Sequence, residues 1–385
     1  MRSTNDVYEV LVIGGGVNGL AALFHLQRLG CKGLGLVERF GLGHQRGSSH
    51  GQSRITRSAY NEARYVRLMQ VVHQQEWPRL EAATQTQLVH PTQGCFWGTP
   101  EGKFTDYAEA VARAGADADC ISVQAARRRF PQFRFGRAQE VLLDRTAAVV
   151  AAADAMAAMA RLNAANGVVV HTDTQVLALD PTVDPIRVET DKGVLQAERL
   201  VVAAGAWAGD LLPFVQPYVR VARQTVGYFI LEGPEEDFQV GRFPVWGYLG
   251  DTDIEYYGLP SFGRPGVKLA RHVIWGVEDD PDEVPAAVDI TEVEFLRQFL
   301  ETHFTAPVER FVDAEHCLYT NTKTEDFIID LHPENERIAV GAGFSGHGFK
   351  FGPMTGRALA ELVLYGKTTV PEFEAMRDVF SIKQD

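Results

Sequence analysis

Three short apolar runs, widely separated along the chain, each lead into glycine-containing sequence. They are Val7–Ile13, Leu200–Ala204 and Ile338–Val340. Apolar side chains at successive positions are typical of parallel strands that are covered on both faces. After the first run, a helical pattern extends to about Leu29, and a second short strand at Gly33–Val37 completes a βαβ unit. The three runs therefore predict one parallel sheet assembled from discontinuous segments.

Shorter strand candidates occupy the middle of the chain, and a helix follows the third run. The strand candidates are residues 168–170, 176–179, 186–190 and 194–195, with a hairpin turn at 191–193. The late helix is predicted from Pro353, which suits a first helical turn, and from Gly366, which suits the position just past a helix end.

The segments 86–145 and 220–325 hold more aromatic residues and mixed charge, and we expect them to form a second, sheet-rich domain. The first domain would then combine residues 1–85, 146–219 and 326–385. A chain of 385 residues is long enough for two domains in close contact. The predicted fold class is α/β plus β, with a Rossmann-type domain and a mixed-sheet domain that covers its ligand.

Composition narrows the class of protein. The net charge of −13 argues against nucleic acid or an anionic membrane surface as a partner. No apolar stretch reaches the ~20 residues of a membrane span, and we expect no signal peptide. Cys31, Cys95, Cys120 and Cys317 have neither zinc spacing nor a disulfide pattern. We therefore expect a cytoplasmic protein whose first three cysteines are small buried hydrophobic residues.

The turn after the first strand has the spacing G-x-G-x-x-G, formed by Gly14, Gly16 and Gly19. The first glycine permits a tight turn, the second lets backbone N–H groups approach a pyrophosphate, and the third allows the helix to pack closely on the strand. Glu38, which follows the second strand, is placed to accept hydrogen bonds from ribose hydroxyls. The motif predicts a dinucleotide cofactor but does not distinguish NAD from FAD.

Several blocks of sequence, in order along nearly the whole chain, point to FAD. They are residues 47–60, 256–258, 261–272, 317–322, 327–333 and 343–351. Together they resemble the monomeric sarcosine oxidase family, which includes N-methyltryptophan oxidase and belongs to the D-amino-acid-oxidase-like flavoproteins. The resemblance implies a monomer that contains FAD and uses a small amino acid and O₂ as substrates.

The resemblance also implies which residues hold the flavin. Cys317 would be the covalent attachment point for the 8α-methyl group, and nearby cations would favour its thiolate. His50 and Arg54 would face the flavin, and Gly346 would lie in a loop against it.

Two cations would hold the substrate carboxylate. The resemblance implies that Arg57 binds it through its forked guanidinium and that Lys350 is the second cationic partner. Arg54, Arg57 and Tyr60 are spaced at i, i+3 and i+6. This spacing would place them on one face if the segment is helical, and its ordinary explanation is a solvated basic surface. The resemblance implies instead a site in which Tyr60, like Arg57, binds the substrate.

Lys268 would be interpreted from composition alone as a surface lysine. The resemblance instead implies that it lies beside the flavin, where a fixed positive charge would assist the reduction of O₂. His272 and Tyr257 would line the substrate side, and Tyr319 is either a further lining residue or a core tyrosine. His347, between two glycines, has no assigned role.

The expected activity is oxidation of the C–N bond of an N-methyl or cyclic secondary amino acid, with sarcosine as the first candidate, to give imine, aldehyde, amine and hydrogen peroxide. Two departures from the family bear on the substrate. A histidine pair is replaced by Ser49-His50, and the stretch 245–250 matches poorly, where Gly247 could give room for a bulkier substrate such as N-methyltryptophan or pipecolate. The alternatives are a dehydrogenase on the same scaffold and a non-catalytic flavin-binding redox protein.

Overall fold

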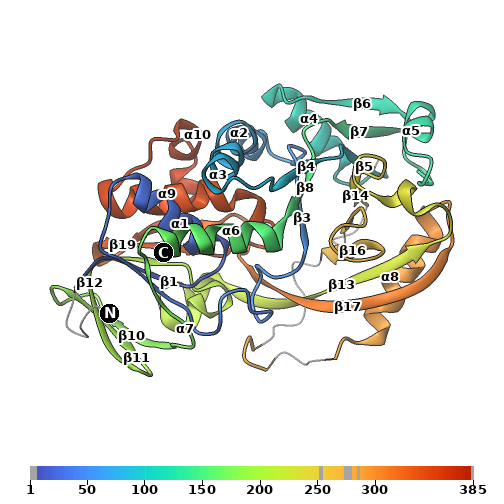
Figure 1. Cartoon of the computed structure of the whole chain (residues 1–385). Helices are drawn as coiled ribbons and strands as arrows, with labels where there is room; N and C mark the ends of the chain where they lie inside the picture. The colour runs from blue at the N-terminus through green and yellow to red at the C-terminus, as the bar shows by residue number, and fades with distance from the viewer. Residues whose placement is uncertain (1–6, 100, 251–254, 273–279, 284–286, 383–385) are drawn as a thin grey trace.

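Two large sheets organise the chain, and a three-stranded sheet lies between them in the view of Figure 1. The structure is a computed structural model that describes residues 7–99, 101–250, 255–272, 280–283 and 287–382. One large sheet contains the N-terminal strand and carries helices against it. The other contains the long strand pair that crosses the lower part of Figure 1.

The first sheet has eight strands, most of them parallel. Its strands are β1 (Tyr8–Ile13), β2 (Leu34–Val37), β9 (Val169–His171), β10 (Val176–Asp180), β11 (Ile186–Thr190), β12 (Gly193–Val202), β18 (Ile328–His332) and β19 (Asn335–Ala342). The parallel order is β9-β2-β1-β12-β19, and β10, β11 and β18 join by antiparallel pairing.

The strands expected from the apolar runs are present in this sheet. The one difference is β12, a single strand of ten residues where two segments were predicted. It is continuous because its first half pairs with β11 and its second half pairs with β1.

Helices α1 (Val17–Arg28), α6 (Ala152–Ala165) and α9 (Gly352–Tyr365) lie on one side of this sheet in Figure 1. Helices α1 and α9 pack closely, because a Cβ on Gly356 of α9 would stand only 2.5 Å from the Cβ of Ala21. The predicted end of α9 is confirmed, since Gly366 follows it with φ of +69°.

The second large sheet has the order β17-β13-β16-β15-β14-β5-β7-β6. Its strands are β5 (Gly94–Gly98), β6 (Ala118–Ser122), β7 (Glu140–Asp144), β13 (Arg220–Leu231), β14 (Val245–Leu249), β15 (Glu255–Leu259), β16 (Val267–His272) and β17 (Val308–Asn321). All of them fall within residues 86–145 and 220–325. The division into two domains remains a prediction.

The other elements connect the two large sheets or cover them. The small sheet is formed by β3 (Ser53–Thr56), β8 (Ala148–Ala151) and β4 (Val89–Pro91). The other helices are α2 (Ala63–Val71), α3 (Trp77–Thr84), α4 (Phe104–Ala114), α5 (Val123–Arg129), α7 (Ala208–Leu211), α8 (Ile290–His303), α10 (Pro371–Glu374) and α11 (Arg377–Phe380). A π-helical turn at Val72–Glu76 joins α2 to α3.

Cys31 and Cys95 are buried as expected, but the same expectation is wrong for Cys120, which is exposed. It lies on β6, which is the edge strand of the second sheet.

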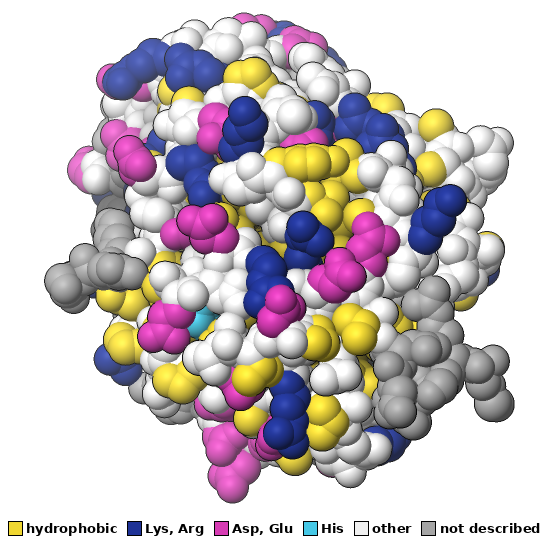
Figure 2. Space-filling model, turned by 90° about the vertical axis from the view of Figure 1, so that its left-hand side faces the viewer, with side chains coloured by type: hydrophobic (Ala, Val, Ile, Leu, Met, Phe, Trp, Pro, Cys, Tyr) yellow, Lys and Arg dark blue, Asp and Glu magenta, His cyan; other side chains and the backbone are white. Residues whose placement is uncertain are grey.

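On the face seen in Figure 2, basic and acidic side chains are interspersed. Among the described residues, no helix combines the length and the apolar character that crossing a membrane requires.

Candidate active site

A cavity of about 480 Å³ draws its lining from both large sheets. All but one of the predicted site residues line it: Gly14, Gly16, Glu38, His50, Arg54, Arg57, Tyr60, Tyr257, Lys268, His272, Cys317, Tyr319, Gly346 and Lys350. The exception is Gly19, which lies inside α1. The fold thus brings to one space residues that are up to 336 positions apart, from Gly14 to Lys350.

The loop between β1 and α1 contains close approaches that require glycine. Gly14 has φ of +102°, and a Cβ there would collide with the carbonyl group of Ala203. A Cβ on Gly19 would collide with the carbonyl oxygen of Gly14, which is the close packing expected of the third glycine. Helix α1 begins with no side-chain cap from its own N-cap residue, an arrangement suited to an anion at the helix start.

Glu38 is buried beside this loop. Its carboxylate accepts hydrogen bonds from the N–H groups of Gly15 at 2.7 Å and Phe40 at 2.9 Å, and the His44 ring is 3.4 Å away. Burial raises the pKa of Glu38, but the hydrogen bonds from His44, Phe40 and Gly15 outweigh it and lower the pKa overall. A charged carboxylate can accept further hydrogen bonds, so Glu38 retains capacity for a ligand hydroxyl.

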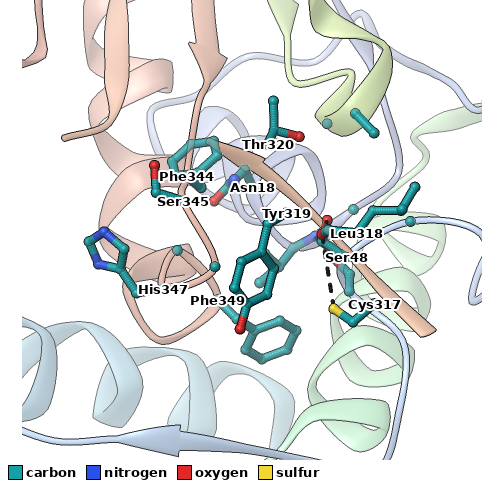
Figure 3. Close-up of a pocket in the computed structure, with 18 of the residues that line it drawn as sticks. Asn18, Ser48, Cys317, Leu318, Tyr319, Thr320, Phe344, Ser345, His347 and Phe349 are labelled. Atoms are coloured by element: carbon teal, nitrogen blue, oxygen red, sulfur yellow. Dashed lines mark hydrogen bonds between the residues drawn. The ribbon is translucent and has the colours of Figure 1, made fainter. Parts of the chain in front are cut away.

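Cys317 and Tyr319 project in the same direction from β17 (Figure 3), as expected for residues two positions apart on a strand. Both side chains are buried and line the cavity. Burial raises the pKa of the Cys317 thiol, while the charges of Arg54 and Lys268 act in the opposite direction. Gly346 packs against Tyr319, because a Cβ on that glycine would collide with the tyrosine ring.

The charge of Arg54 acts both on this thiol and on His50. Arg54 donates to the carbonyl oxygens of Ser53 at 2.9 Å and Ser48 at 3.0 Å, and its guanidinium stands 5.4 Å from the ring centre of Phe349. Burial, together with the charge of Arg54, lowers the pKa of His50 to about 4, so the imidazole is neutral at pH 7.

Lys268 is buried on β16, between β13 and β15, so the interpretation of it as a surface residue is wrong. Its Nζ donates to the carbonyl oxygen of Ser53 at 2.9 Å. Burial, assisted by the charge of Arg54, lowers the pKa of Lys268 to about 7. Its position inside the second large sheet explains the burial that its local sequence did not reveal.

Arg57 follows β3 directly, so the condition of a helical segment around Arg54 and Arg57 is not met. Residues Ser53–Thr56 form a strand because they pair with β8. The Arg57 guanidinium lies 4.4 Å from the ring centre of Tyr60. Its Nη1 is buried without a hydrogen-bond partner among the described residues.

A hydrogen-bonded chain of Lys350, Tyr60 and His347 forms another part of the cavity lining. Lys350 Nζ donates to the Tyr60 hydroxyl at 3.0 Å, and this hydroxyl lies 3.1 Å from Nδ1 of His347. Nε2 of His347 lies 3.0 Å from the carbonyl oxygen of Glu325. Burial lowers the pKa of both Lys350 and His347 well below their usual values. His347, which had no predicted role, therefore supports the residue that contacts Lys350.

The remaining predicted residues form a polar wall. The hydroxyls of Tyr257 and Tyr319 are 3.1 Å apart, and burial raises the pKa of both. Tyr319 thus takes the lining position. The His272 ring centre is 5.5 Å from that of Tyr319, and its Nε2 is 3.5 Å from a carboxylate oxygen of Glu325.

Gly247 lines the cavity but does not widen it. A Cβ on Gly247 would stand 2.8 Å from Cδ1 of Phe96. The space beside this glycine is therefore filled by a phenyl ring, and the expectation that Gly247 makes room for a bulkier substrate is wrong.

Asp144 braces the loop that carries Arg57 and Tyr60, although nothing in the local sequence indicated it. It is completely buried at the end of β7. One carboxylate oxygen accepts from the backbone N–H of Ser58 at 2.7 Å and of Ala59 at 2.9 Å. The other oxygen accepts from the N–H of Thr146 at 2.9 Å and from its hydroxyl.

The variant Asp144→Asn is expected to lower the free energy of unfolding by about 1–3 kcal/mol, because an amide cannot accept all four hydrogen bonds and leaves buried donors unpaired. Asp180→Asn is the matched control. Asp180 makes the same two contacts with Thr182 but lies at the surface. Chemical denaturation measures both variants, and equal losses would show that the contacts with the loop contribute nothing.

The cavity fits a large ligand with both polar and phosphate groups. Both ring nitrogens of His50 and Nη1 of Arg57 are buried without a hydrogen-bond partner in the described part of the chain. Unpaired buried polar atoms are rare in native proteins and indicate a missing partner. The glycine loop at the start of α1 and the carboxylate of Glu38 fit the pyrophosphate and ribose of a dinucleotide.

Comparison with known proteins agrees with this geometry. Residues 9–362 match the DAO family model, described as FAD dependent oxidoreductase. The chain is 35% identical over 369 residues to the peroxisomal sarcosine oxidase of Homo sapiens, covering 94% of this chain and 93% of that protein. It is 34% identical to the monomeric sarcosine oxidase of Bacillus sp. (strain B-0618), with the same coverage.

Among solved structures, the open form of NikD, an amino acid oxidase essential for nikkomycin biosynthesis, superposes with a TM-score of 0.81. The match covers 98% of both chains at 24% identity, so it establishes the shared fold. The predicted resemblance and fold class are both confirmed. The chain belongs to the family of FAD-dependent oxidoreductases that includes the monomeric and peroxisomal sarcosine oxidases.

Proposed function

We propose that this protein is an FAD-dependent oxidase that acts on the C–N bond of a secondary amino acid, with sarcosine as the first candidate. The observation that carries the proposal is that Arg57, whose buried Nη1 has no hydrogen-bond partner among the described residues, lines the same cavity as the buried Lys350. The sarcosine oxidases among its relatives support it. For sarcosine, the overall reaction with O₂ and water gives glycine, formaldehyde and hydrogen peroxide.

FAD fits the part of the cavity that is lined by the glycine loop after β1 and by Glu38. The N-terminus of α1 would face the pyrophosphate, and Glu38 would accept hydrogen bonds from the ribose hydroxyls. His50, with two unpaired buried ring nitrogens, would contact the bound cofactor. When bound, FAD supplies the two-electron acceptor for oxidation of the substrate carbon.

The substrate carboxylate would bind between Arg57 and Lys350. Fixing one end of the amino acid in this way orients the C–H bond to be broken. Tyr257 and Tyr319 remain neutral because burial raises the pKa of both. Together with His272 they would face the amine and exclude water from it.

We assign the covalent attachment to Cys317. Forming this thioether removes one hydrogen from the thiol and one from the 8α-methyl group, and the two electrons and two protons end on O₂ as hydrogen peroxide. The assignment is supported by the burial of the thiol within the cavity and by the charges of Arg54 and Lys268 beside it.

Cys317→Ser is expected to give a protein that releases its yellow colour on acid precipitation, whereas the unchanged protein keeps it in the pellet, because a serine hydroxyl forms no thioether. Cys95→Ser is the control, since Cys95 is also a buried strand cysteine but does not line the cavity. If the flavin of the Cys317→Ser protein stays with the pellet, the link is elsewhere.

We propose that O₂ is the electron acceptor, so that the protein is an oxidase and not a dehydrogenase. The reduction of O₂ would take place beside Lys268. Adding a panel of secondary amino acids without oxygen tests the reaction: sarcosine or a larger N-methyl or cyclic amine should bleach the flavin. One hydrogen peroxide per reduced flavin on admission of air supports the oxidase. Bleaching without peroxide indicates the dehydrogenase, and no bleaching by any amine indicates a flavin-binding protein without turnover.

We also propose a monomer, as in the relatives named monomeric sarcosine oxidase. The cytoplasmic location remains a prediction, and the human and mouse relatives are named peroxisomal. Sedimentation and imaging of the tagged protein in its own cell would measure these two properties.

A further inference from the structure

We propose that Phe96 positions Arg57 and limits the size of the substrate. Phe96 is buried, lines the cavity and lies on β5. The proposal rests on the proposed function in one respect, because it takes Arg57 as the group that binds the substrate carboxylate.

Arg57 is surrounded by aromatic rings. The charge of Glu255 raises the pKa of Arg57, but no ion pair joins the two side chains among the described residues, and Glu255 pairs with Lys103. The described residues form many ion pairs, but none of those found involves Arg57. Its guanidinium instead lies 4.4 Å from the ring centre of Tyr60, 5.4 Å from that of Phe96 and 5.5 Å from that of Tyr107. Ring faces attract a guanidinium.

This choice of partners has a chemical consequence. A carboxylate partner would occupy the N–H donors of Arg57 and compete with the substrate for them. The face of Phe96 attracts the same cation without accepting a directed hydrogen bond from it. The unpaired Nη1 therefore remains available for the carboxylate of an incoming amino acid.

Two glycines fix the Phe96 ring in this position. Gly247 of β14 is its register partner in the parallel pairing with β5, and a Cβ there would stand 2.8 Å from Cδ1 of Phe96. Gly94 lies two residues earlier on β5, and a Cβ there would stand 2.6 Å from Cε2 of Phe96. The phenyl ring thus takes space that two side chains would otherwise fill.

The same ring closes one wall of the cavity. Because Phe96 on β5 and Gly247 on β14 both line the cavity, removal of the phenyl group would enlarge the substrate space toward these two strands. Phe96 would therefore have two separable effects. Its π face positions Arg57, and its volume excludes amino acids with large side chains.

Two variants of the FAD-loaded protein separate these effects. Phe96→Met keeps most of the volume but removes the ring face. Phe96→Ala also opens the space. The control is Phe135→Met, because Phe135 is equally buried but does not line the cavity. Calorimetry measures the binding of methoxyacetate, a sarcosine analogue in which oxygen replaces the amine.

Phe96→Met is expected to weaken methoxyacetate binding by about 3- to 10-fold, which lies within the effect of one cation–π contact, and to raise KM for sarcosine more than it lowers kcat. Phe96→Ala is expected to raise kcat/KM for racemic N-methylleucine relative to sarcosine by about tenfold, since each methylene accommodated in a pocket is worth at least that factor. Neither effect is expected in Phe135→Met.

The outcomes distinguish the two proposals. If the unchanged protein binds methoxyacetate and Arg57→Met abolishes the binding, but Phe96→Met behaves as Phe135→Met does, the inference about Phe96 is wrong and the proposed function stands. If Arg57→Met binds methoxyacetate as well as the unchanged protein does, the proposed carboxylate site itself is wrong.

Discussion

The variant Lys268→Met is expected to react with O₂ about two to three orders of magnitude more slowly than the unchanged protein, once both have been reduced by substrate. Transfer of electrons to O₂ creates negative charge in a site with little water, where the loss of one fixed donor typically costs that factor. Lys268 is 4% exposed, and methionine matches its length without the charge. Stopped-flow mixing of the reduced protein with oxygenated buffer measures the rate.

The anaerobic reduction of Lys268→Met by substrate should change much less. Lys350→Met provides the contrast, since Lys350 is also a buried lysine in the cavity but contacts Tyr60 on the substrate side. It should weaken substrate binding and leave the reaction with O₂ intact. Equal losses in both half-reactions for Lys268→Met would remove Lys268 from the oxygen site.

The pH dependence of the O₂ reaction follows from the same residue. Burial lowers the pKa of Lys268 to about 7, and an anion beside it would raise that pKa. The ammonium is present below the pKa and lost above it, so the rate with O₂ should fall as pH rises through 7 or a higher value. In Lys268→Met this fall should be absent.

The variant Arg57→Met is expected to raise KM for the amino acid by about two orders of magnitude. Loss of one partner from a buried charged pair costs about 2–5 kcal/mol, and the remaining Lys350 keeps the effect in the lower half of that range. The physical reason is the loss of the unpaired, buried guanidinium donor. Steady-state kinetics with sarcosine, or with the best amine of the panel, measures the change.

A substrate without a carboxylate supplies the control for Arg57→Met. For N-methylethylamine, KM should be high in the unchanged protein and similar in the variant. Arg57→Lys should recover part of the lost affinity, since it restores the charge without the fork. An unchanged KM for the amino acid in Arg57→Met would contradict the assignment.

The sequence predicted the parallel sheet well because its strands are locally unambiguous. Each of β1, β12 and β19 contains apolar residues at successive positions. The turns that need a glycine, at Gly14 and Gly366, can each be recognised from a few neighbouring residues. The main error was to predict two separate segments where β12 is one continuous strand.

The site was less accessible to local reasoning because its contacts are long-range. Lys268 is buried by strands β13 and β15, and the strand conformation before Arg57 depends on pairing with β8. Asp144 forms a hydrogen bond with Ser58, which is 86 positions away in the sequence, and a contact at this separation cannot be predicted from a local pattern. The resemblance to a family identified several lining residues, such as Cys317 and Lys350, but not Phe96, whose proposed role depends on the absence of side chains at two glycines.

The spacing of Cys317 and Tyr319 on β17 constrains how this protein can diversify. Two residues at positions i and i+2 of one strand are separated by about 6.6–6.8 Å along it. A shift of β17 would therefore displace both the proposed cofactor attachment at Cys317 and the cavity-lining Tyr319. Substitutions on β17 would disturb redox chemistry and substrate fit at once. Strands β5 and β14 carry no anchor, and descendants of this gene could therefore acquire new substrates by changing these strands while inheriting the oxidative chemistry unaltered.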